Sequence, residues 1–433
     1  MMQRIGAVLL AALLAVGAVA CGDDETASGK GDDPTTSASR TLRVPEDHDT
    51  IQAAVDASKP GDLVLISAGV YNESVTVETE DLTIRGLDRN KVVIDGEFKN
   101  ENGIKVFSNN VAVENLTVRN NTGNGVFFTG DYGKGFILEG YRVSYVTAYN
   151  NGSYGTYAFN ARRGQFDHSY GSGHPDSAFY VGQCQDCDAL LTDLVGETNM
   201  LGYSGTNSTG VTIVNSLFQK NRAGIVPNSS WGEKLAPNSG TVVVGNRVFD
   251  NNNPLAPDNK SFSIAWGNGI VLGGVSNNVV ERNLVRGNIN AGLVITDYPP
   301  STNPETKKEE TFKPEGNQVR DNVFADNGMD LAYLTINFAS RPFGNCFENN
   351  DVSSSFPEDL ETKMACTPGL DTDLGDLSGV LARLNPPPPD VDWKKVAAPP
   401  DQPQMPDADT APGKGAKDVA GTIDTSTITT PTA

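Results

Sequence analysis

The chain has few of the residues that most often carry enzyme chemistry. Its 433 residues include three histidines, three tryptophans and five cysteines. Basic residues are also scarce, because 33 lysines and arginines stand against 54 aspartates and glutamates, a net charge of −21. Subtracting the charges of the two ends leaves −14 on residues 41–370. An acidic body argues against nucleic acid and anionic lipid surfaces as partners.

A long apolar run occurs at the N-terminus, over residues 5–20. It is short for a bilayer span but suits the apolar region of a signal peptide. It ends in "GAVAC", which resembles a bacterial lipoprotein signal, in which a cysteine is lipidated and becomes the new N-terminus. That resemblance implies that residues 1–20 are removed and Cys21 anchors the chain to a membrane of the cell envelope, outside the cytoplasm. Ordinary secretion with cleavage near Ala20 is the alternative.

Both ends of the mature chain have compositions that cannot bury a core. Residues 21–40 are small, polar and acidic, and predict a flexible tether. Residues 371–433 are rich in proline and threonine, and predict a disordered tail. Of the other four cysteines, Cys346 and Cys366 predict a disulfide that closes the end of the fold. For the Cys184-Gln-Asp-Cys187 stretch a small structural disulfide is favoured over a redox or zinc half-site.

The region between the ends is a repeat with few helix-forming runs. Segments such as "VAVENLTVRNN" (111–121), "VTIVNSLFQKN" (211–221) and "NQVRDNVFADN" (317–327) recur every 23 or 24 residues where no loop is inserted. Such a period predicts a solenoid, whose rungs bury their apolar faces against one another. We therefore expect residues 41–370 to form one all-β domain, a right-handed parallel β-helix, as a monomer. A β-propeller is the alternative, but its blades need about 40–50 residues.

The first rungs carry a family resemblance. "TIQAAVDASKPGDLVLISAGVYNESVTV" (50–77) resembles the opening of the pectin-lyase-like superfamily of β-helix proteins, which includes pectate lyases, uronan epimerases and many surface proteins of unknown activity. Within it, Asp49 or Thr50 is expected to start a short helix that caps the solenoid. The resemblance implies the fold for residues 41–370 and a polysaccharide as partner.

One asparagine recurs at a fixed place in the rungs, and three neighbouring rungs replace it. The column comprises Asn115, Asn215, Asn246, Asn283, Asn322 and Asn349. Tyr145, His168 and Asp193 stand at this place in the third, fourth and fifth coils. Because the position is expected to point inward, we interpret these three residues as a structural network inside the turn.

The same fourth coil holds the candidate catalytic residues. Tyr170 is expected to face outward, and His174 and Asp176 to lie exposed in or beside the next turn. Arg162 and Arg163, at the start of the coil, add local positive charge.

The candidate substrate-binding residues are Arg162 and a set of aromatic residues. Phe179 is expected to face outward level with Phe127 and Tyr157, as an aromatic strip that could stack on sugars. Trp266 is a further sugar-stacking candidate, in one of four inserts that could wall a groove, at residues 131–140, 229–238, 251–266 and 297–315.

These residue types suit proton abstraction beside a carboxylate. The C5–H of a uronate sugar becomes acidic when arginine or a bound cation such as Ca²⁺ neutralises its carboxylate, and histidine and tyrosine then exchange the protons. The run from Tyr170 to Asp176 resembles the Tyr-Gly-x-Asp-Pro-His motif of mannuronan C5-epimerases, with His174 and Asp176 exchanged across the proline. "QFDHSYG" (165–171) resembles a pectate lyase segment. A lyase or epimerase is therefore one hypothesis, and a non-catalytic glycan-binding or structural surface protein is the other.

Overall fold

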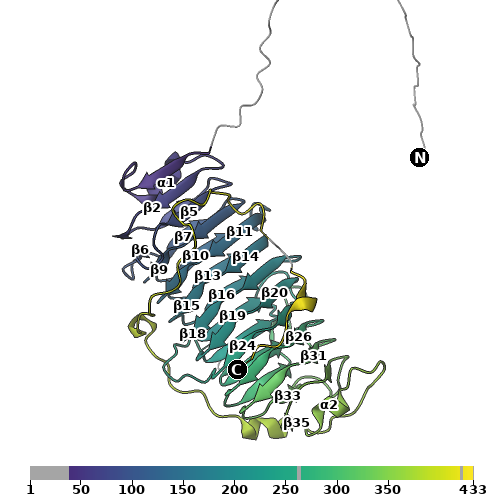
Figure 1. The fold of residues 1–433 in the computed structure, drawn as a ribbon. Coiled ribbons are helices and arrows are strands. Elements are labelled where there is room, and N and C mark those ends of the chain that lie inside the picture. The colour runs from purple at the N-terminus through teal and green to yellow at the C-terminus, as the bar shows by residue number, and fades with distance from the viewer. Residues whose placement is uncertain (1–38, 261–264, 420–422, 433) are drawn as a thin grey trace, which may run out of the picture. The chain divides into compact units, whose positions relative to one another are not determined.

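The computed structural model describes residues 39–260, 265–419 and 423–432. The expected signal peptide, Cys21 and most of the tether lie outside these residues. From Thr41 to Phe356 the chain winds repeatedly through three parallel sheets, which we name A, B and C (Figure 1). Each full coil contributes one strand to each sheet, in the order A, B, C. The structure is therefore the predicted parallel β-helix.

The strands of each sheet lie next to the corresponding strands of the preceding and following coils. Sheet A contains β1 (Thr41–Val44), β2 (Leu63–Ile66), β5 (Thr83–Gly86), β8 (Val111–Glu114), β11 (Leu138–Ser144), β14 (Ala161–Asp167), β17 (Ala189–Thr192), β20 (Val211–Val214), β23 (Val242–Val244), β26 (Val279–Glu281), β31 (Gln318–Arg320) and β34 (Cys346–Glu348). Sheet B contains β3 (Gly69–Tyr71), β6 (Val92–Asp95), β9 (Thr117–Arg119), β12 (Thr147–Tyr149), β15 (Tyr170–Ser172), β18 (Val195–Glu197), β21 (Leu217–Gln219), β24 (Arg247–Phe249), β27 (Leu284–Arg286) and β32 (Val323–Ala325). Sheet C contains β4 (Val75–Val77), β7 (Asn102–Val106), β10 (Asn124–Thr129), β13 (Thr156–Phe159), β16 (Ser177–Gly182), β19 (Leu201–Thr206), β22 (Ala223–Asn228), β25 (Asn268–Gly273), β28 (Ala291–Thr296), β33 (Leu331–Leu334) and β35 (Ser355–Phe356).

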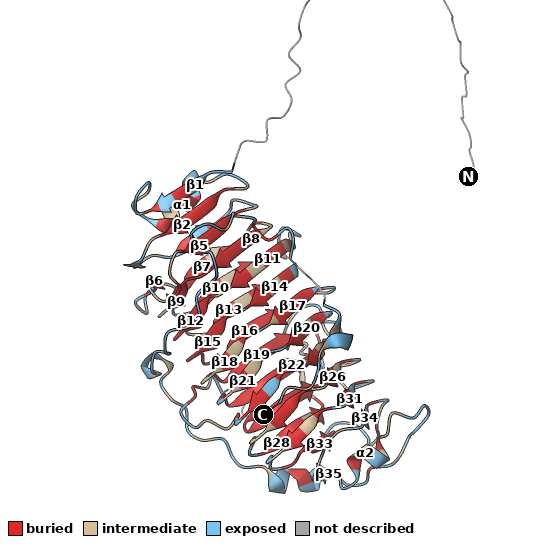
Figure 2. Cartoon of the chain, in the orientation of Figure 1, coloured by how far each residue is buried: buried red, intermediate tan, exposed pale blue. Residues whose placement is uncertain are grey.

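Strand pairing fixes which side chains form the core. Alternate residues of each strand point inward and stack on their equivalents in neighbouring coils. Most strand residues are buried (Figure 2). Val113, Val143 and Phe166 are one such stack, with no exposed surface. Since each coil has too little apolar surface to fold alone, the stacking supplies the stability that the repeat implied.

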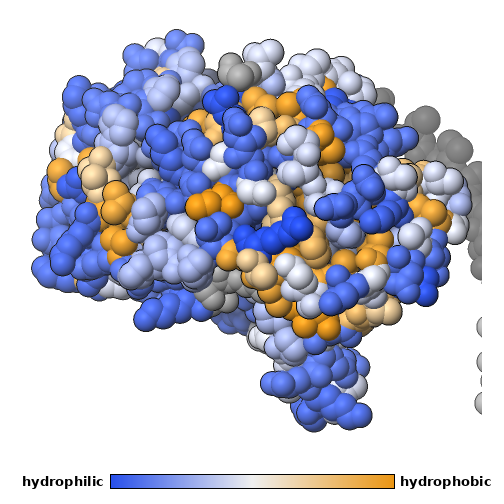
Figure 3. Space-filling model, turned by 90° about the horizontal axis from the view of Figure 1, so that it is seen from below, coloured by the Kyte–Doolittle hydropathy of each residue, from blue (hydrophilic) through white to orange (hydrophobic). Residues whose placement is uncertain are grey.

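Both ends of the solenoid are closed. Helix α1 (Ile51–Ala57) begins after Thr50, whose side chain accepts a hydrogen bond from the Ala53 amide at 3.1 Å. At the other end, α2 (Leu360–Lys363) buries Leu360 on the last coil, and a disulfide joins Cys346 to Cys366 as expected. The view from below this end shows hydrophobic residues broken up by hydrophilic ones (Figure 3). These caps prevent the end strands from pairing with other chains.

The predicted asparagine column is in fact two neighbouring positions. Asn115 and Asn215 have positive φ, at 51° each, and occupy the left-handed residue of the turn between sheets A and B. Asn246 and Asn283 occupy the next position, which points inward. There the backbone amide of Asn246 donates to the Asn283 side chain at 2.9 Å, which passes a hydrogen bond from coil to coil. Tyr145, His168 and Asp193 also have positive φ, so they fall in the outer position and not in the ladder.

The C-terminal tail requires a correction. The composition predicted disorder, but residues 385–418 lie against the β-helix, as the yellow-green trace of Figure 1 shows. The buried Arg89 donates to the Pro403 carbonyl at 2.9 Å, and Arg222 donates to the Pro389 carbonyl at 2.7 Å. The tail contains the short 3-10 helices η2 (Ser378–Arg383), η3 (Trp393–Lys395) and η4 (Thr425–Thr427). Composition indicated that the tail cannot fold alone, which does not prevent it from docking on a ready surface.

Candidate functional site

The outer face of sheet C differs from the other two sheets in charge. Its eleven strands contain one charged residue, Lys105. Strand register places Lys105, Phe127, Tyr157 and Tyr180 next to one another in four successive coils, and we call these residues the aromatic column. The rings of Phe127 and Tyr157 are parallel with centroids 4.5 Å apart, and the Lys105 ammonium lies 5.4 Å from the Phe127 centroid.

The column corrects the prediction for Phe179. Phe179 is paired with Thr156, has no exposed surface and packs in the core, whereas Tyr180 continues the column. Counting residues along the repeat aligns Ser177 with the glycine that opens this strand in other coils, such as Gly155, but the strand pairing makes Ala178 its equivalent. Because side chains alternate along a strand, a shift of one residue moves each of them to the opposite face.

Three of the four predicted inserts interlock beside the column. The Lys234 ammonium of insert 229–238 lies 4.5 Å from the Tyr132 ring centroid of insert 131–140. Trp231, in the same insert as Lys234, stacks on Phe312 of insert 297–315 at 4.5 Å. Insert 297–315 itself contains the hairpin of β29 (Ser301–Thr302) and β30 (Glu309–Glu310). The inserts therefore form one layer, as a groove wall requires.

Two carboxyl groups meet the tyrosines at this place. Asp176 accepts hydrogen bonds from Ser177 at 3.2 Å and from Asn259, in the fourth insert, at 2.8 Å. Glu233 accepts from the Tyr180 hydroxyl at 3.1 Å and from the Gln183 amide at 2.8 Å. In the described part of the chain, neither carboxylate pairs with a lysine, arginine or histidine.

Burial without a cation raises the pKa of both acids. The pKa of Asp176 rises from 3.8 to about 7, through burial first and the charge of Glu233 in addition. Burial likewise raises the pKa of Glu233. Both charges also act on the tyrosines: burial, Glu233 and Asp176 together raise the pKa of Tyr157 and of Tyr298. Asp176, Glu233, Tyr154, Tyr157, Tyr180 and Tyr298 thus form one electrostatically coupled group, the acid–tyrosine cluster.

His174, predicted to be exposed, is fully buried. It replaces asparagine in a second ladder, at the turn between sheets B and C, where its amide donates to the Asn199 side chain at 3.1 Å. Its Nδ1 accepts from the Asn151 amide at 3.3 Å, and its Nε2 lies 3.2 Å from the Ala148 carbonyl oxygen. A neutral ring with its hydrogen on Nε2 satisfies both contacts, and burial lowers the pKa of His174 to about 4. Such a side chain supports the turn and has no surface for a polymer.

His168, predicted to point inward, is 45% exposed. Its ring stacks on Tyr145 at 4.6 Å, and its Nδ1 lies 3.0 Å from the Asp167 carboxylate. That hydrogen bond raises the pKa of His168. Asp193 follows on the next coil and is exposed. The expected network therefore lies on the outer surface of the turn between sheets A and B, and its buried member is Asp167.

Three other predicted residues lie outside the acid–tyrosine cluster. Tyr170 is 5% exposed on sheet B, where its hydroxyl donates to Glu197 at 2.8 Å. Arg163 is on sheet A and pairs with Glu139 at 2.9 Å, and Arg162 is its half-buried neighbour. The structure therefore brings Asp176 and Tyr157 together and separates them from Tyr170 and Arg163.

Trp266 is not a sugar platform in this structure. It is 7% exposed and lies beside Leu201, Ala223 and Pro387 of the tail around a small cavity. The guanidinium of Arg222 lies 5.8 Å from its ring centroid.

Sequence reasoning missed Glu233, Tyr154 and the outward direction of Tyr180. A signal for Glu233 did exist, because it is the sole acid of insert 229–238, which lengthens its coil beyond the repeat. Tyr154 directly precedes a strand-opening glycine, and its ring lies 4.5 Å from Tyr157 and 4.8 Å from Tyr180.

Within the described ranges, no group of three or more histidine, cysteine, aspartate or glutamate side chains is placed to hold a metal ion. The Ca²⁺ expectation has no such site in that part of the chain. In the same residues, no helix is both long and apolar enough to cross a membrane. The second cysteine pair, Cys184 and Cys187, forms a disulfide.

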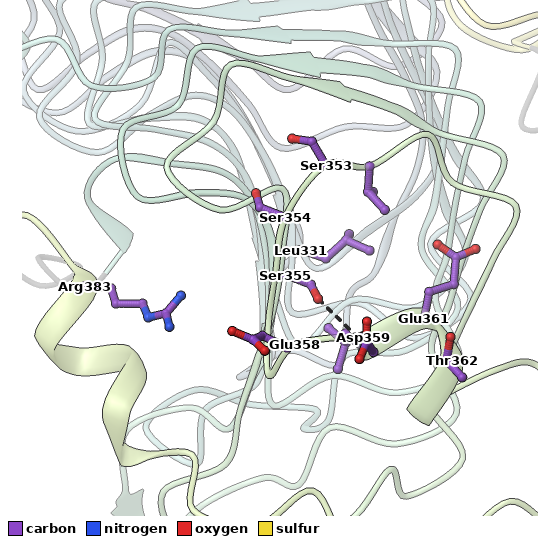
Figure 4. A pocket seen from close by; sticks show the side chains of 11 residues that line it. Leu331, Ser353, Ser354, Ser355, Glu358, Asp359, Glu361, Thr362 and Arg383 are labelled. Carbon is purple, nitrogen blue, oxygen red and sulfur yellow. Dashed lines mark hydrogen bonds between the residues drawn. The ribbon is translucent and has the colours of Figure 1, made fainter.

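A cavity of about 540 Å³ lies at the last coil, near α2. Figure 4 shows Arg383 extending from η2 toward Glu358, with Asp359 and the serines Ser354 and Ser355 nearby. No aromatic side chain lines this cavity. The inserts and the acid–tyrosine cluster therefore make sheet C the stronger candidate.

Comparison with known proteins bears on the fold. The A-module of the mannuronan C-5 epimerase AlgE4 from Azotobacter vinelandii is 11% identical, with a TM-score of 0.50 over 71% of this chain and 91% of that chain. The A-module of AlgE6 from the same organism is 12% identical, with a TM-score of 0.44 over 70% and 92% of the two chains. The pectate lyase Pel9A is 14% identical, with a TM-score of 0.41 over 73% and 78%. At this identity the likeness to the AlgE4 module shows the fold, a right-handed parallel β-helix, and no activity.

No protein-family model matches the chain. No curated protein matches it either.

Proposed function

We propose that the chain binds a polysaccharide on the outer face of sheet C and cleaves it by acid–base catalysis with Asp176 and Glu233. The observation that carries this proposal is the pair of half-buried carboxyl groups, held among tyrosines without a cationic partner. Two carboxyl groups whose environments keep one of them protonated are the usual equipment for breaking glycosidic bonds.

The roles follow from the two environments. Asp176, with a pKa of about 7, holds a proton in a large fraction of molecules near neutral pH and donates it to the glycosidic oxygen. As the bond between that oxygen and the anomeric carbon breaks, a water molecule attacks the carbon and gives its proton to Glu233. The Tyr180 hydroxyl and the Gln183 amide orient Glu233 for this step through the hydrogen bonds described above.

The uronate lyase or C5-epimerase expected from the sequence is less well supported. Such a reaction needs a base near the substrate and a group that neutralises its carboxylate. Tyr170 and His174 are buried, and Arg163 pairs with Glu139. The raised pKa values of Tyr154 and Tyr180 disfavour a tyrosinate base. Hydrolysis uses groups that are present in the cluster, so we favour it.

The test is an activity screen of the full chain against polysaccharide panels. New reducing ends would report hydrolysis, absorbance of unsaturated products would report a lyase, and NMR would report an epimerase. We expect hydrolysis, and a loss of ~10²-fold or more in Asp176→Asn and in Glu233→Gln. Asp193→Asn, on the turn between sheets A and B, is the matched control and should retain activity. Binding without turnover on the whole panel would favour the non-catalytic alternative.

We also propose that Cys21 is lipidated and anchors the protein to a membrane of a bacterial cell envelope. This rests on "GAVAC" after the apolar run, since these residues lie outside the described structure. Wild-type protein should fractionate with membranes, and Cys21→Ala should appear in the soluble fraction or keep its signal peptide. Soluble wild-type protein would contradict the anchor.

A further inference from the structure

The charge distribution of sheet C narrows the class of glycan. Among the residues of its eleven strands, Lys105 is the one charge, whereas β14 of sheet A alone contains three charged residues (Arg162, Arg163 and Asp167). A uronate polymer carries a carboxylate on every sugar, and each would need a cation or strong donors at the surface to replace its water. The strands of sheet C cannot supply these along their length.

The acids of the cluster make a polyanion still less suited. Burial raises the pKa values of Asp176 and Glu233, no cation among the described residues offsets that effect, and the charge of each acid raises the pKa of nearby tyrosines. A substrate carboxylate beside them would add a third negative charge in a partly desolvated place. Lys105 and Lys234, on the same side of the β-helix, lie over the aromatic rings of Phe127 and Tyr132.

The exposed chemistry of the column is aromatic instead. Phe127 and Tyr157 are half-buried and stack on each other across two coils, so each ring covers one face of the other. The parts of the two rings that remain exposed are apolar and offer contact to the C–H groups of a sugar without a charged partner. Hydroxyl groups of an uncharged sugar would find the polar edge of the cluster, at Tyr154 and Asp176.

We infer that the ligand of sheet C is an uncharged glycan, which packs against Phe127 and Tyr157 and reaches Asp176 and Glu233. This inference rests on the proposed function and deepens it by naming the substrate class. A protein partner on the same rings is the competing occupant, and the experiment below separates it.

The experiment is calorimetric titration of the full chain with neutral oligosaccharides (gluco-, xylo- and manno-oligomers) and with uronate oligomers of equal length. We expect neutral oligomers to bind at least ~10-fold more tightly, with an affinity that changes little as salt is raised, because no ion pairs are screened. Phe127→Ala should weaken neutral binding by about 3- to 10-fold. Phe98→Ala, a half-buried aromatic on the sheet B side, should leave it unchanged.

The possible outcomes test the charge class of the ligand and the proposed polysaccharide function separately. Tighter binding of uronate oligomers, weakened by salt or by Lys105→Gln, would overturn the uncharged class and leave a polysaccharide function standing. Absence of binding to either class would overturn the proposed function itself. Self-association that Phe127→Ala abolishes, without glycan binding, would make the column a protein interface and overturn the inference. The wild-type salt dependence decides the charge class even if Phe127→Ala does not fold.

Discussion

Sheets A and C are built from the same coils, yet their outer faces have opposite chemistry. On sheet A, Arg85 pairs with Glu114 at 2.7 Å and Arg142 pairs with Asp167 at 3.0 Å, while Arg142 also reaches Glu114 at 3.5 Å. These charges neutralise one another across coils, and the tail covers part of them. On sheet C the strands carry aromatic and small side chains and only Lys105 as a charge. Sheet A pairs its charged groups within the protein, whereas sheet C carries the rings at which the proposed ligand binds.

The largest difference between the two faces should appear in the unfolding free energy when one charge is removed from each face. Glu114 and Arg85 are nearly fully buried, so Glu114→Gln leaves a buried guanidinium without its counter-ion and should cost about 3–5 kcal/mol of unfolding free energy. Lys105→Gln on sheet C should change it by less than ~0.5 kcal/mol. Urea denaturation of both variants measures this. Equal effects would mean that the charge ladder of sheet A is not structural.

A smaller difference in unfolding free energy should separate alanine substitutions of the two histidines, His174 and His168. His174→Ala removes the two imidazole contacts, with the Asn151 amide and the Ala148 carbonyl, from a fully buried position and should cost about 2–4 kcal/mol. His168→Ala, in the exposed outer position, should cost less than ~1 kcal/mol. His174→Asn restores the residue type of neighbouring coils and should recover part of the loss. If urea denaturation showed a larger cost for His168→Ala than for His174→Ala, the strand register of this coil would be wrong.

These histidines illustrate what the sequence could and could not predict. The repeat length, the Thr50 cap and the Cys346–Cys366 disulfide followed from spacing and chemistry, because they depend on local pattern. The inward or outward direction of His168, His174 and Phe179 depends on a single-residue register, and the asparagine column mixed two adjacent positions. Predicting whether a side chain points inward or outward therefore required the strand pairing itself.

The functional cluster was harder to predict for a different reason. Asp176 and Tyr157 were identified, but Glu233 lies in an insert 57 residues after Asp176. Nothing in a sequence says over which sheet an insert will fold. The docked tail is a similar case, since its partners, such as Arg89 and Arg222, are distant in the chain.

The smallest expected effect concerns how the folding stability depends on pH through Asp176. The folded-state pKa of Asp176, about 7, lies above its ordinary value of 3.8, so the folded chain binds a proton that the unfolded chain releases between these values. The stability contributed by Asp176 is therefore complete below pH ~4 and is lost as pH rises toward 7, by about 1–2 kcal/mol after allowance for partial exposure. Asp176→Asn should flatten this slope in urea denaturation series. Activity should fall above pH ~7 for the same reason, since the acid loses its proton.

The most direct test of the central claim is a crystal structure of the full chain with Glu233→Gln, to prevent turnover, in complex with a neutral oligosaccharide. We expect sugar rings packed against Phe127 and Tyr157, with a glycosidic oxygen within hydrogen-bond distance of Asp176. An oligosaccharide bound along sheet A or B, with the aromatic column empty, would contradict it.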